Sequence, residues 1–466
     1  MVIFIARNCK KVMTFLKKSA YLAAALLMMA SCAKCPDIPV EGGMVRGVKS
    51  GTPGVTVFKG IPYAAPPVDS LRWREPAPVI PWEGVRVADK FGPISWQEDL
   101  SDMPLYGREF YSGGMPEMSE DCLYLNVWAP TGTVGDVRAK LPVAVWIHGG
   151  AFDHGYGSEV TMDGSEWARR GVILVTINYR VGMMGFYTNS ALFAESPVHR
   201  SGNFGIYDQN AALRWVSRNI GRFGGDPRNI TVMGQSAGAR SVKTLVSSPI
   251  AKPRIAKAII QSGGGISVVD QFDRDNIITV RQKGDAFMKY AGYDSLAQMK
   301  AASPQELMQK YNEYVADGGE LTFGPVSDFY LVGTTFTASV VRKGIADIPY
   351  MIGYTAGDGD RKAIEIDEFC ASRNYYEGKP VYQYKFDRQM PGDDAGAFHS
   401  SELWYMFGTL DKCWRPLTRA DKALSAEMLD AWTNFCKYGD PEGAEPSGSW
   451  PEFTKDNPYR KIFDVK

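Results

Sequence analysis

Short runs of apolar, β-branched residues recur along the chain, and the stretches between them read as helix or loop. Runs that are apolar throughout are typical of strands buried on both faces of a sheet. Their alternation with helices predicts an α/β fold, with a mainly parallel central sheet flanked by helices. The clearest predicted strands cover residues 142–148, 172–178, 229–233, 258–261, 350–353 and 381–386.

Two segments between these strands have a helical pattern. Residues 208–220 (DQNAALRWVSRNI) place apolar side chains at the spacing of one helix face, which predicts an amphipathic helix. Residues 272–314 also look helical but less tied to the sheet. They are a candidate lid or substrate-facing insertion, although the sequence favours a plain packing layer of helices.

The rest of the chain has no internal repeat, low-complexity tract or Pro/Ser-rich linker after its first forty residues. Residues 32–466 are therefore expected to form a single domain. Basic and acidic residues are balanced at 52 each, and no Lys/Arg run lies outside the N-terminus. This pattern makes nucleic acid an unexpected partner.

The N-terminus has the pattern of an export signal. Lys17 and Lys18 precede an apolar run over residues 20–30, which is too short to span a bilayer. Residues 1–31 are predicted to be a signal peptide, with Met13 a better start than Met1. Its removal leaves 47 basic residues against 52 acidic ones, so the mature chain is mildly acidic.

Residues 29–32 (Met-Ala-Ser-Cys) are similar to a relaxed lipobox, the bacterial signal at which a Cys is lipidated. This favours Cys32 as a lipidated mature N-terminus over an ordinary signal peptide cut near Ser31. The expected location is the bacterial cell envelope, periplasmic or at the cell surface. Membrane contact is expected only through this anchor.

Four cysteines fall within the domain, and their pairing stays open: Cys122, Cys370, Cys413 and Cys436. None follows Cys-x-x-Cys spacing, so no zinc site is expected.

The strongest chemical signal is Ser236, at the centre of residues 234–238 (Gly-Gln-Ser-Ala-Gly). The preceding residues read as a strand, and a helix is expected from Ala237 onward. Such a pentapeptide arises by chance in turns, but its place at a strand-to-helix turn favours Ser236 as a nucleophile.

A serine nucleophile needs a general base, usually a His that a carboxylate orients. The chain has four His. His399 is the remaining candidate once His148, His154 and His199 are set aside, and it follows a late strand, as in hydrolases ordered Ser, acid, His. From elimination alone, a structural role for His399 stays equally open.

Residues 147–152 (IHGGAF) follow a predicted strand and supply consecutive glycine amides. The N–H groups of Gly149, Gly150 and Ala237 are expected to stabilise an oxyanion. The alternative is a tight glycine turn without a catalytic role. The position of the segment upstream of Ser236 favours the oxyanion interpretation.

Together with further segments in the same order, these motifs resemble the type-B carboxylesterase family. That family includes cholinesterases, bacterial nitrobenzyl esterases and the non-catalytic neuroligins. Other matching segments are residues 58–64 (FKGIPYA), 119–127 (SEDCLYLNV), 202–209 (GNFGIYDQ) and 223–227 (FGGDP). The resemblance implies a single α/β-hydrolase catalytic domain that hydrolyses small-molecule esters through an acyl-enzyme, without cofactor or metal.

The resemblance also implies a triad. Ser236 matches the family nucleophile, and residues 396–403 (GAFHSSEL) look like the family's segment around the base, His399. The family usually has Glu as the acid, whereas residues 353–359 (GYTAGDG) carry Asp358. Asp358 is the expected acid, and Asp360 is the nearest alternative.

A departure from the family concerns Cys122, which in relatives often closes a small disulfide with an upstream Cys. Residues 92–95 (Gly-Pro-Ile-Ser) have Ser at that place. The bridge is therefore expected to be absent, and the loop over residues 96–117 freer to move or diverge. Phe110 or Tyr111 lies near the place where cholinesterases bind choline, but choline recognition is not carried over.

Two alternatives remain open at this point. One is a non-catalytic binding protein like the neuroligins, which retention of the triad and the glycine pair disfavours. The other is a lipase or amidase on the same fold. Substrate identity and oligomeric state do not follow from the sequence.

Overall fold

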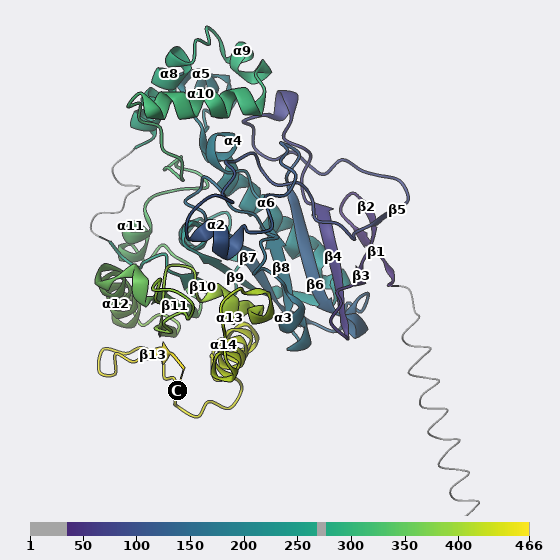
Figure 1. The fold of residues 1–466 in the computed structure, drawn as a ribbon, viewed down its shortest axis with the longest axis vertical. Helices are drawn as coiled ribbons and strands as arrows, with labels where there is room; N and C mark the ends of the chain where they lie inside the picture. The colour runs from purple at the N-terminus through teal and green to yellow at the C-terminus, as the bar shows by residue number, and fades with distance from the viewer. Residues whose placement is uncertain (1–34, 268–275, 466) are drawn as a thin grey trace, which may run out of the picture. The chain divides into compact units, whose positions relative to one another are not determined.

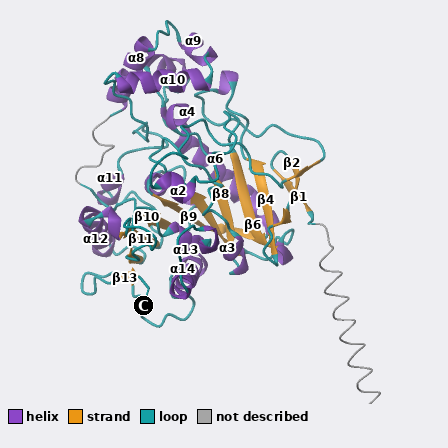
Figure 2. Cartoon of the chain, viewed as in Figure 1, coloured by secondary structure: helices purple, strands orange, loops and turns teal. Residues whose placement is uncertain are grey.

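The computed structural model describes residues 35–267 and 276–465, and Asp37–Lys466 form one compact unit. Its centre is a ten-stranded sheet in the order β13-β12-β11-β10-β9-β7-β8-β6-β4-β3, with a separate three-stranded sheet β1-β2-β5 (Figures 1 and 2). The strands are β1 (Asp37–Val40), β2 (Gly43–Arg46), β3 (Val48–Lys49), β4 (Val55–Pro62), β5 (Val85–Val87), β6 (Tyr124–Pro130), β7 (Leu141–Ile147), β8 (Ile173–Ile177), β9 (Gly225–Gln235), β10 (Lys257–Gln261), β11 (Tyr350–Thr355), β12 (Val381–Phe386) and β13 (Arg460–Phe463).

Strands β7 to β13 of the large sheet run parallel to one another. Strands β6, β4 and β3 join them in antiparallel pairs. The six strands predicted from the sequence are confirmed as β7 to β12, and the mainly parallel α/β sheet is confirmed with them. Strand β9 is longer than predicted, because its exposed beginning lacks the apolar run used to find it.

Helices flank the sheet, and the predicted helix over residues 208–220 is confirmed within α6. The helices are α2 (Tyr106–Phe110), α3 (Ser165–Arg169), α4 (Gly182–Phe186), α5 (Ser190–Glu195), α6 (Phe204–Asn219), α7 (Ala237–Ser247), α8 (Ile277–Tyr290), α9 (Leu296–Ala301), α10 (Pro304–Ala316), α11 (Phe336–Val341), α12 (Asp360–Tyr375), α13 (Leu403–Phe407) and α14 (Arg419–Tyr438).

Strand β7 shows how the sheet separates two cores. Val143, Val145 and Ile147 pack in a cluster with α6, α7, α11 and α12. Ala144 and Trp146 alternate with them and pack in a second cluster with α3, α13 and α14. Because successive strand side chains point to opposite faces, both faces of the sheet are buried, which explains its uninterrupted apolar runs.

Helices α8, α9 and α10 form an insertion with an apolar cluster of its own, built with α4 and α5 rather than with the sheet. The hydroxyl of Tyr187 donates to the carbonyl of Gly284 at 2.9 Å, and its ring packs edge-on against Phe287. Side-chain caps from Asn276, Ser295 and Ser303 begin the three helices.

The helical character of this region is confirmed where the structure describes it. The cluster is separate from both sheet cores and α10 lines a cavity described below, which favours a substrate-facing insertion over the plain packing layer that the sequence favoured.

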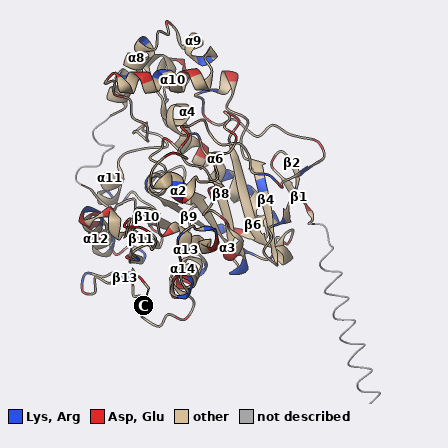
Figure 3. Ribbon diagram, viewed as in Figure 1, with Lys and Arg blue, Asp and Glu red and all other residues tan. Residues whose placement is uncertain are grey.

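The predicted signal peptide, Met13 and Cys32 lie outside the described residues. Among helices built from residues 35–267 and 276–465, none combines the length and apolar character needed to cross a membrane. Basic and acidic side chains are interspersed over the elements of the unit (Figure 3).

Candidate active site

Ser236 lies at the turn between strand β9 and helix α7, where the sequence predicted it. Its φ of 56° and ψ of −120° are strained for a residue with a side chain. The Ser236 N–H donates to the carbonyl of Gln261 on the neighbouring strand β10 at 2.9 Å, which holds the turn against the sheet. The hydroxyl is thus presented at the carboxyl end of the central strands.

The glycine after this turn is required by packing. A Cβ added to Gly238 would lie 2.0 Å from the carbonyl oxygen of Ile147, at the end of β7. Only glycine lets α7 start this close to β7. This close approach brings the residues that follow β7 beside the serine.

His399 and Asp358 are in direct contact. His399 Nδ1 lies 2.5 Å from Asp358 Oδ1. The His399 side chain is 32% exposed and the Asp358 side chain 4% exposed, so the carboxylate lies behind the ring. This bond makes Nδ1 the protonated nitrogen and leaves a lone pair on Nε2.

Asp358 is fixed by its own backbone as well as by His399. Its second carboxylate oxygen accepts from the Thr355 N–H at 3.0 Å, in a capping box at the end of β11. Burial raises the pKa of Asp358, but the contacts with His399 and Thr355 outweigh burial and hold the pKa below its usual value. Asp360, the alternative acid, begins α12 and is exposed.

Gln235 is a contact of the base that the sequence did not predict. The Gln235 Nε2 lies 3.1 Å from His399 Nε2, so the amide donates to the lone pair of the imidazole. Gln235 ends β9, directly before Ser236. The amide that contacts His399 Nε2 therefore comes from the position directly before Ser236.

The loop after β7 lies against Ser236, as expected of an oxyanion loop. Gly149 packs against the Ser236 side chain: a Cβ added to Gly149 would be 3.2 Å from Ser236 Cβ. Gly150 has a φ of 100°, and a Cβ there would lie 2.1 Å from the carbonyl oxygen of His154. The structure also brings Ala151, which the sequence reasoning missed, into the cavity that holds Ser236.

The backbone conformation of this loop leaves its N–H groups without hydrogen-bond acceptors in the protein. Ala151 has a φ of 53°, and the chain turns sharply there. In the described part of the chain, the N–H groups of Gly149, Gly150, Ala151 and Ala237 donate to no protein acceptor. Free amides at the start of α7 favour negative charge, because the helix dipole is positive at that end.

The other three histidines lie in different surroundings. His148 is buried and stacks on Tyr179 with ring centroids 4.2 Å apart, and burial lowers its pKa to about 3. Burial lowers the pKa of His154 to about 4. His199 is exposed beside Phe193. Of the four, His399 has the carboxylate partner that a general base needs.

A buried acid, Glu402, lies behind the His399–Asp358 pair. Its side chain is fully buried, and Oε1 accepts from Gln261 Nε2 at 3.4 Å. Burial and the neighbouring Asp358 raise the pKa of Glu402 to about 7. A protonated Glu402 spares Asp358 a second negative charge nearby, so it favours ionised Asp358.

Ser236 and His399 share a cavity of about 200 Å³. The loop after β7, with Gly149, Gly150 and Ala151, forms one wall. Aromatic side chains of α2 and of the residue after it form another: Tyr106, Phe110 and Tyr111. Glu159 lies in the same wall region and accepts from the Tyr111 hydroxyl at 3.4 Å. Burial raises the pKa of Glu159 to about 7.

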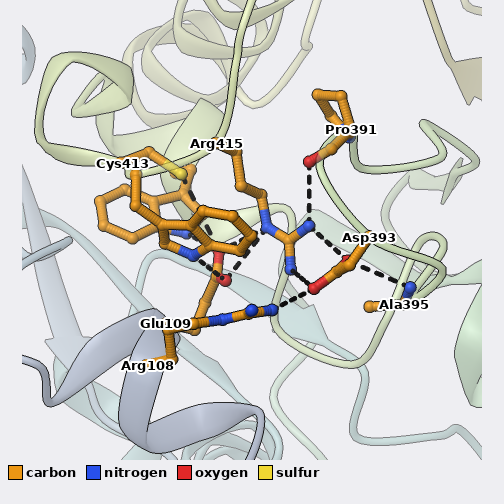
Figure 4. A network of polar contacts seen from close by, with 9 residues as sticks. Arg108, Glu109, Pro391, Asp393, Ala395, Cys413 and Arg415 are labelled. Carbon is orange, nitrogen blue, oxygen red and sulfur yellow. Dashed lines mark hydrogen bonds and ion pairs between the residues drawn. The ribbon is translucent and has the colours of Figure 1, made fainter.

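A network of ion pairs and hydrogen bonds anchors this aromatic wall to the segment that carries His399 (Figure 4). Glu109 on α2 and Arg415 pair at 3.0 Å, and both side chains are fully buried. The indole N–H of Trp404 donates to Glu109 at 2.8 Å, and Arg415 also pairs with Asp393 at 2.7 Å. Arg108 forms a further ion pair with Asp393.

We expect Glu109→Gln to lower the free energy of unfolding by about 3 kcal/mol, because it leaves the buried Arg415 without the one of its two countercharges that is itself fully buried. Equilibrium urea denaturation measures the change. Asp136→Asn is the matched control, since the Asp136–Arg138 pair is exposed and its loss should cost under about 1 kcal/mol. A Glu109→Gln effect no larger than the control would contradict a stabilising role for the network.

The predicted absence of the small disulfide at Cys122 agrees with the structure, in which Cys122 is a free thiol, as are Cys370, Cys413 and Cys436. The Cys122 thiol is buried beside Ser95. Backbone hydrogen bonds join the two ends of the loop instead. The Ile94 carbonyl accepts from the Ser119 N–H at 2.8 Å, and the Ile94 N–H donates to the Glu117 carbonyl at 2.9 Å. With the Glu109 network, this gives the loop anchors that the sequence did not indicate.

No metal cluster is found in the described ranges: three or more His, Cys, Asp or Glu side chains nowhere gather there in a way that could hold an ion. The pieces that the site does bring together are a serine on a strained turn, an imidazole–carboxylate pair and a loop of free amides.

Comparison with known proteins agrees with this geometry. A family model described as "Carboxylesterase family" matches residues 34–369 and 363–464. The para-nitrobenzyl esterase of Bacillus subtilis (strain 168) is 32% identical over 92% of this chain and 94% of its own. The fumonisin B1 esterase of Sphingopyxis macrogoltabida is 30% identical over 89% of this chain and 84% of its own.

Solved structures give the same result. A PNB esterase superposes with a TM-score of 0.78 at 31% identity, over 92% of this chain and 96% of its own. A carboxylesterase of Geobacillus stearothermophilus superposes with a TM-score of 0.76 at 30% identity, over the same shares. With its α/β-hydrolase sheet and its serine at the strand-to-helix turn, this chain belongs to the carboxylesterase family.

Proposed function

We propose that the protein hydrolyses carboxylic esters with Ser236 as nucleophile, His399 as general base and Asp358 as the acid that orients the base. The observation that carries this proposal is the 2.5 Å contact between His399 Nδ1 and Asp358, in the cavity that also holds Ser236. Membership of the carboxylesterase family makes an acyl-enzyme the expected intermediate.

The first step is proton transfer from the Ser236 hydroxyl to His399 Nε2 as the serine oxygen attacks the ester carbonyl. In the structure Gln235 donates to this nitrogen. The hydroxyl of Ser236 must take its place, and such catalytic contacts commonly tighten only when substrate binds. Asp358 stabilises the imidazolium that forms, and Nε2 then protonates the leaving alcohol.

Backbone N–H groups stabilise the negative charge that develops on the carbonyl oxygen. We assign Gly149, Gly150 and Ala237 to this oxyanion site, and Ala151 is a further donor of the same loop. A donor of this kind contributes about 2.7–4 kcal/mol to transition-state stabilisation in other hydrolases. Water then attacks the acyl-enzyme, with His399 again acting as base.

The cavity around Ser236 is about 200 Å³, which favours small ester groups. We expect kcat/KM for 4-nitrophenyl esters to be higher for short acyl chains than for palmitate. The anilide analogue 4-nitroacetanilide should react far more slowly, because its amine is a poorer leaving group. A spectrophotometric assay of nitrophenol or nitroaniline release measures both series.

The alternatives give different results in this assay. Rates that rise toward palmitate would favour a lipase, and faster release of nitroaniline than of nitrophenol would favour an amidase. If none of the esters is hydrolysed, a non-catalytic binding protein is the better interpretation.

We also propose that the protein is exported and lipidated at Cys32, from the Lys17–Lys18 pair, the apolar run that follows them and the lipobox-like residues 29–32. We expect the wild type to incorporate a fatty-acid label and the Cys32→Ala variant to incorporate none. Labelling that persists in this variant would overturn the assignment of Cys32.

A further inference from the structure

A second, larger cavity of about 640 Å³ adjoins the catalytic one. Met103 and His154 line both cavities, so the two cavities are neighbours that share these side chains as a wall. The larger volume lies within the range of about 300–1,000 Å³ usual for small-molecule sites. An ester arm that passes Met103 and His154 would enter this space.

The walls of the larger cavity are mainly apolar. Met183 and Met184 of α4 are buried there, and Met308 and Tyr311 come from α10 of the helical insertion. Phe323 completes the aromatic part. Methionine side chains adapt to ligands of different shape, so this wall suits a flexible apolar chain rather than one rigid group.

The charges that line the larger cavity are all negative. Glu98, Asp99 and Asp153 are its carboxylates, and no Lys or Arg is among its described lining residues. Burial keeps its one imidazole, His154, neutral at pH 8 by lowering its pKa to about 4. In residues 35–267 and 276–465, none of the three carboxylates takes part in an ion pair.

All three carboxylates are reached by solvent, and two of them, Glu98 and Asp153, also act electrostatically on the cavity wall. The third, Asp99, accepts a hydrogen bond from the Ser101 hydroxyl at 2.6 Å. Partial desolvation and the charge of Glu98 raise the pKa of Asp153 to about 7. Burial, Asp153 and Glu98 together raise the pKa of Tyr311 to about 12. A positive group in this cavity would relieve the repulsion, and a negative one would add to it.

We propose that the larger cavity binds the bulkier arm of the ester and selects an apolar arm that ends in a cation, such as a protonated amine, over one that ends in a carboxylate. Asp153 and Glu98 are the residues that make this selection. The inference rests on the proposed esterase function, because it assigns a binding site to the substrate of Ser236.

The test uses two series of six-carbon esters at pH 8. In the first, the acyl arm varies among 4-nitrophenyl 6-aminohexanoate, hexanoate and adipate. In the second, the alcohol arm varies among the acetate esters of 6-aminohexanol, hexanol and 6-hydroxyhexanoate. In the series whose variable arm enters the larger cavity, we expect kcat/KM for the cation to exceed that for the anion by about tenfold.

The double variant Asp153→Asn, Glu98→Gln should reduce this ratio toward one. Glu313→Gln, which removes one acidic charge from α10 outside the cavity lining, is the matched control and should keep the wild-type ratio. A wild-type cation-to-anion ratio below two in both series, or an unchanged ratio in the double variant, would overturn the proposal. If no neutral ester of either series is hydrolysed, the esterase function itself fails, which is a distinguishable result.

Discussion

Ser236→Ala should lower kcat for a short-chain 4-nitrophenyl ester by about a millionfold, which leaves only the residual catalysis that the oxyanion amides and substrate binding provide. The substitution removes the oxygen that attacks the carbonyl and leaves the rest of the site in place. Ser236 is buried only in part, at the entrance of α7, so little packing is lost. Stopped-flow or steady-state nitrophenol release measures the rate.

The matched control is Ser247→Ala, on the same helix. The Ser247 hydroxyl donates to the Lys243 carbonyl at 2.8 Å and lies outside the catalytic cavity. Its removal should change kcat by less than about twofold, because substitutions away from the site and the core have small effects. Equal rates for Ser236→Ala and the wild type would remove Ser236 from the mechanism.

Asp358→Asn should lower kcat by about ten-thousandfold. The amide keeps the size of the carboxylate but loses the charge that stabilises the His399 imidazolium, and it no longer fixes the protonated Nδ1. KM should change little, because Asp358 lies behind the ring rather than against substrate. Steady-state kinetics with a short-chain ester separate the two parameters.

Asp360→Asn is the paired variant, since Asp360 begins α12 and is exposed. An acid at a helix N-terminus contributes about 0.3–1 kcal/mol to stability and nothing to proton transfer. We expect kcat to remain within about twofold of the wild type. A larger loss from Asp360→Asn than from Asp358→Asn would reverse the assignment of the acid.

The sheet could be predicted because its strands are buried on both faces. Strand β7 is an uninterrupted apolar run and β8 is interrupted only by Thr176, and this pattern can be recognised without knowledge of the neighbouring strands. The antiparallel edge was not predicted, because β3 is two residues long and β4 carries polar positions. The role of the helical insertion does not follow from its sequence, because amphipathic helices have the same pattern whether they pack on a sheet or on other helices.

The chemistry of the site was predictable where it is carried by short motifs. The turn at Ser236 and the loop at Gly149 and Gly150 are local, and each glycine has a steric reason that the sequence already suggests. Asp358 and His399 required the resemblance to a family, because they meet across 41 residues.

The supporting contacts were not predictable, because they join side chains far apart in the chain. Glu109 and Arg415 are 306 residues apart, and nothing in either neighbourhood indicates that both are buried. The contact of Gln235 with His399 spans 164 residues. The larger cavity likewise combines loops and α10, whose positions follow only from the fold.

The most direct test of the central claim, that Ser236 is the nucleophile, is covalent labelling with a fluorophosphonate, which reacts with activated serines. Intact-mass and peptide mass spectrometry locate the adduct. We predict one adduct per chain, on the peptide that contains Ser236, and none in Ser236→Ala. An adduct on another residue, or equal labelling of the variant, would contradict the account.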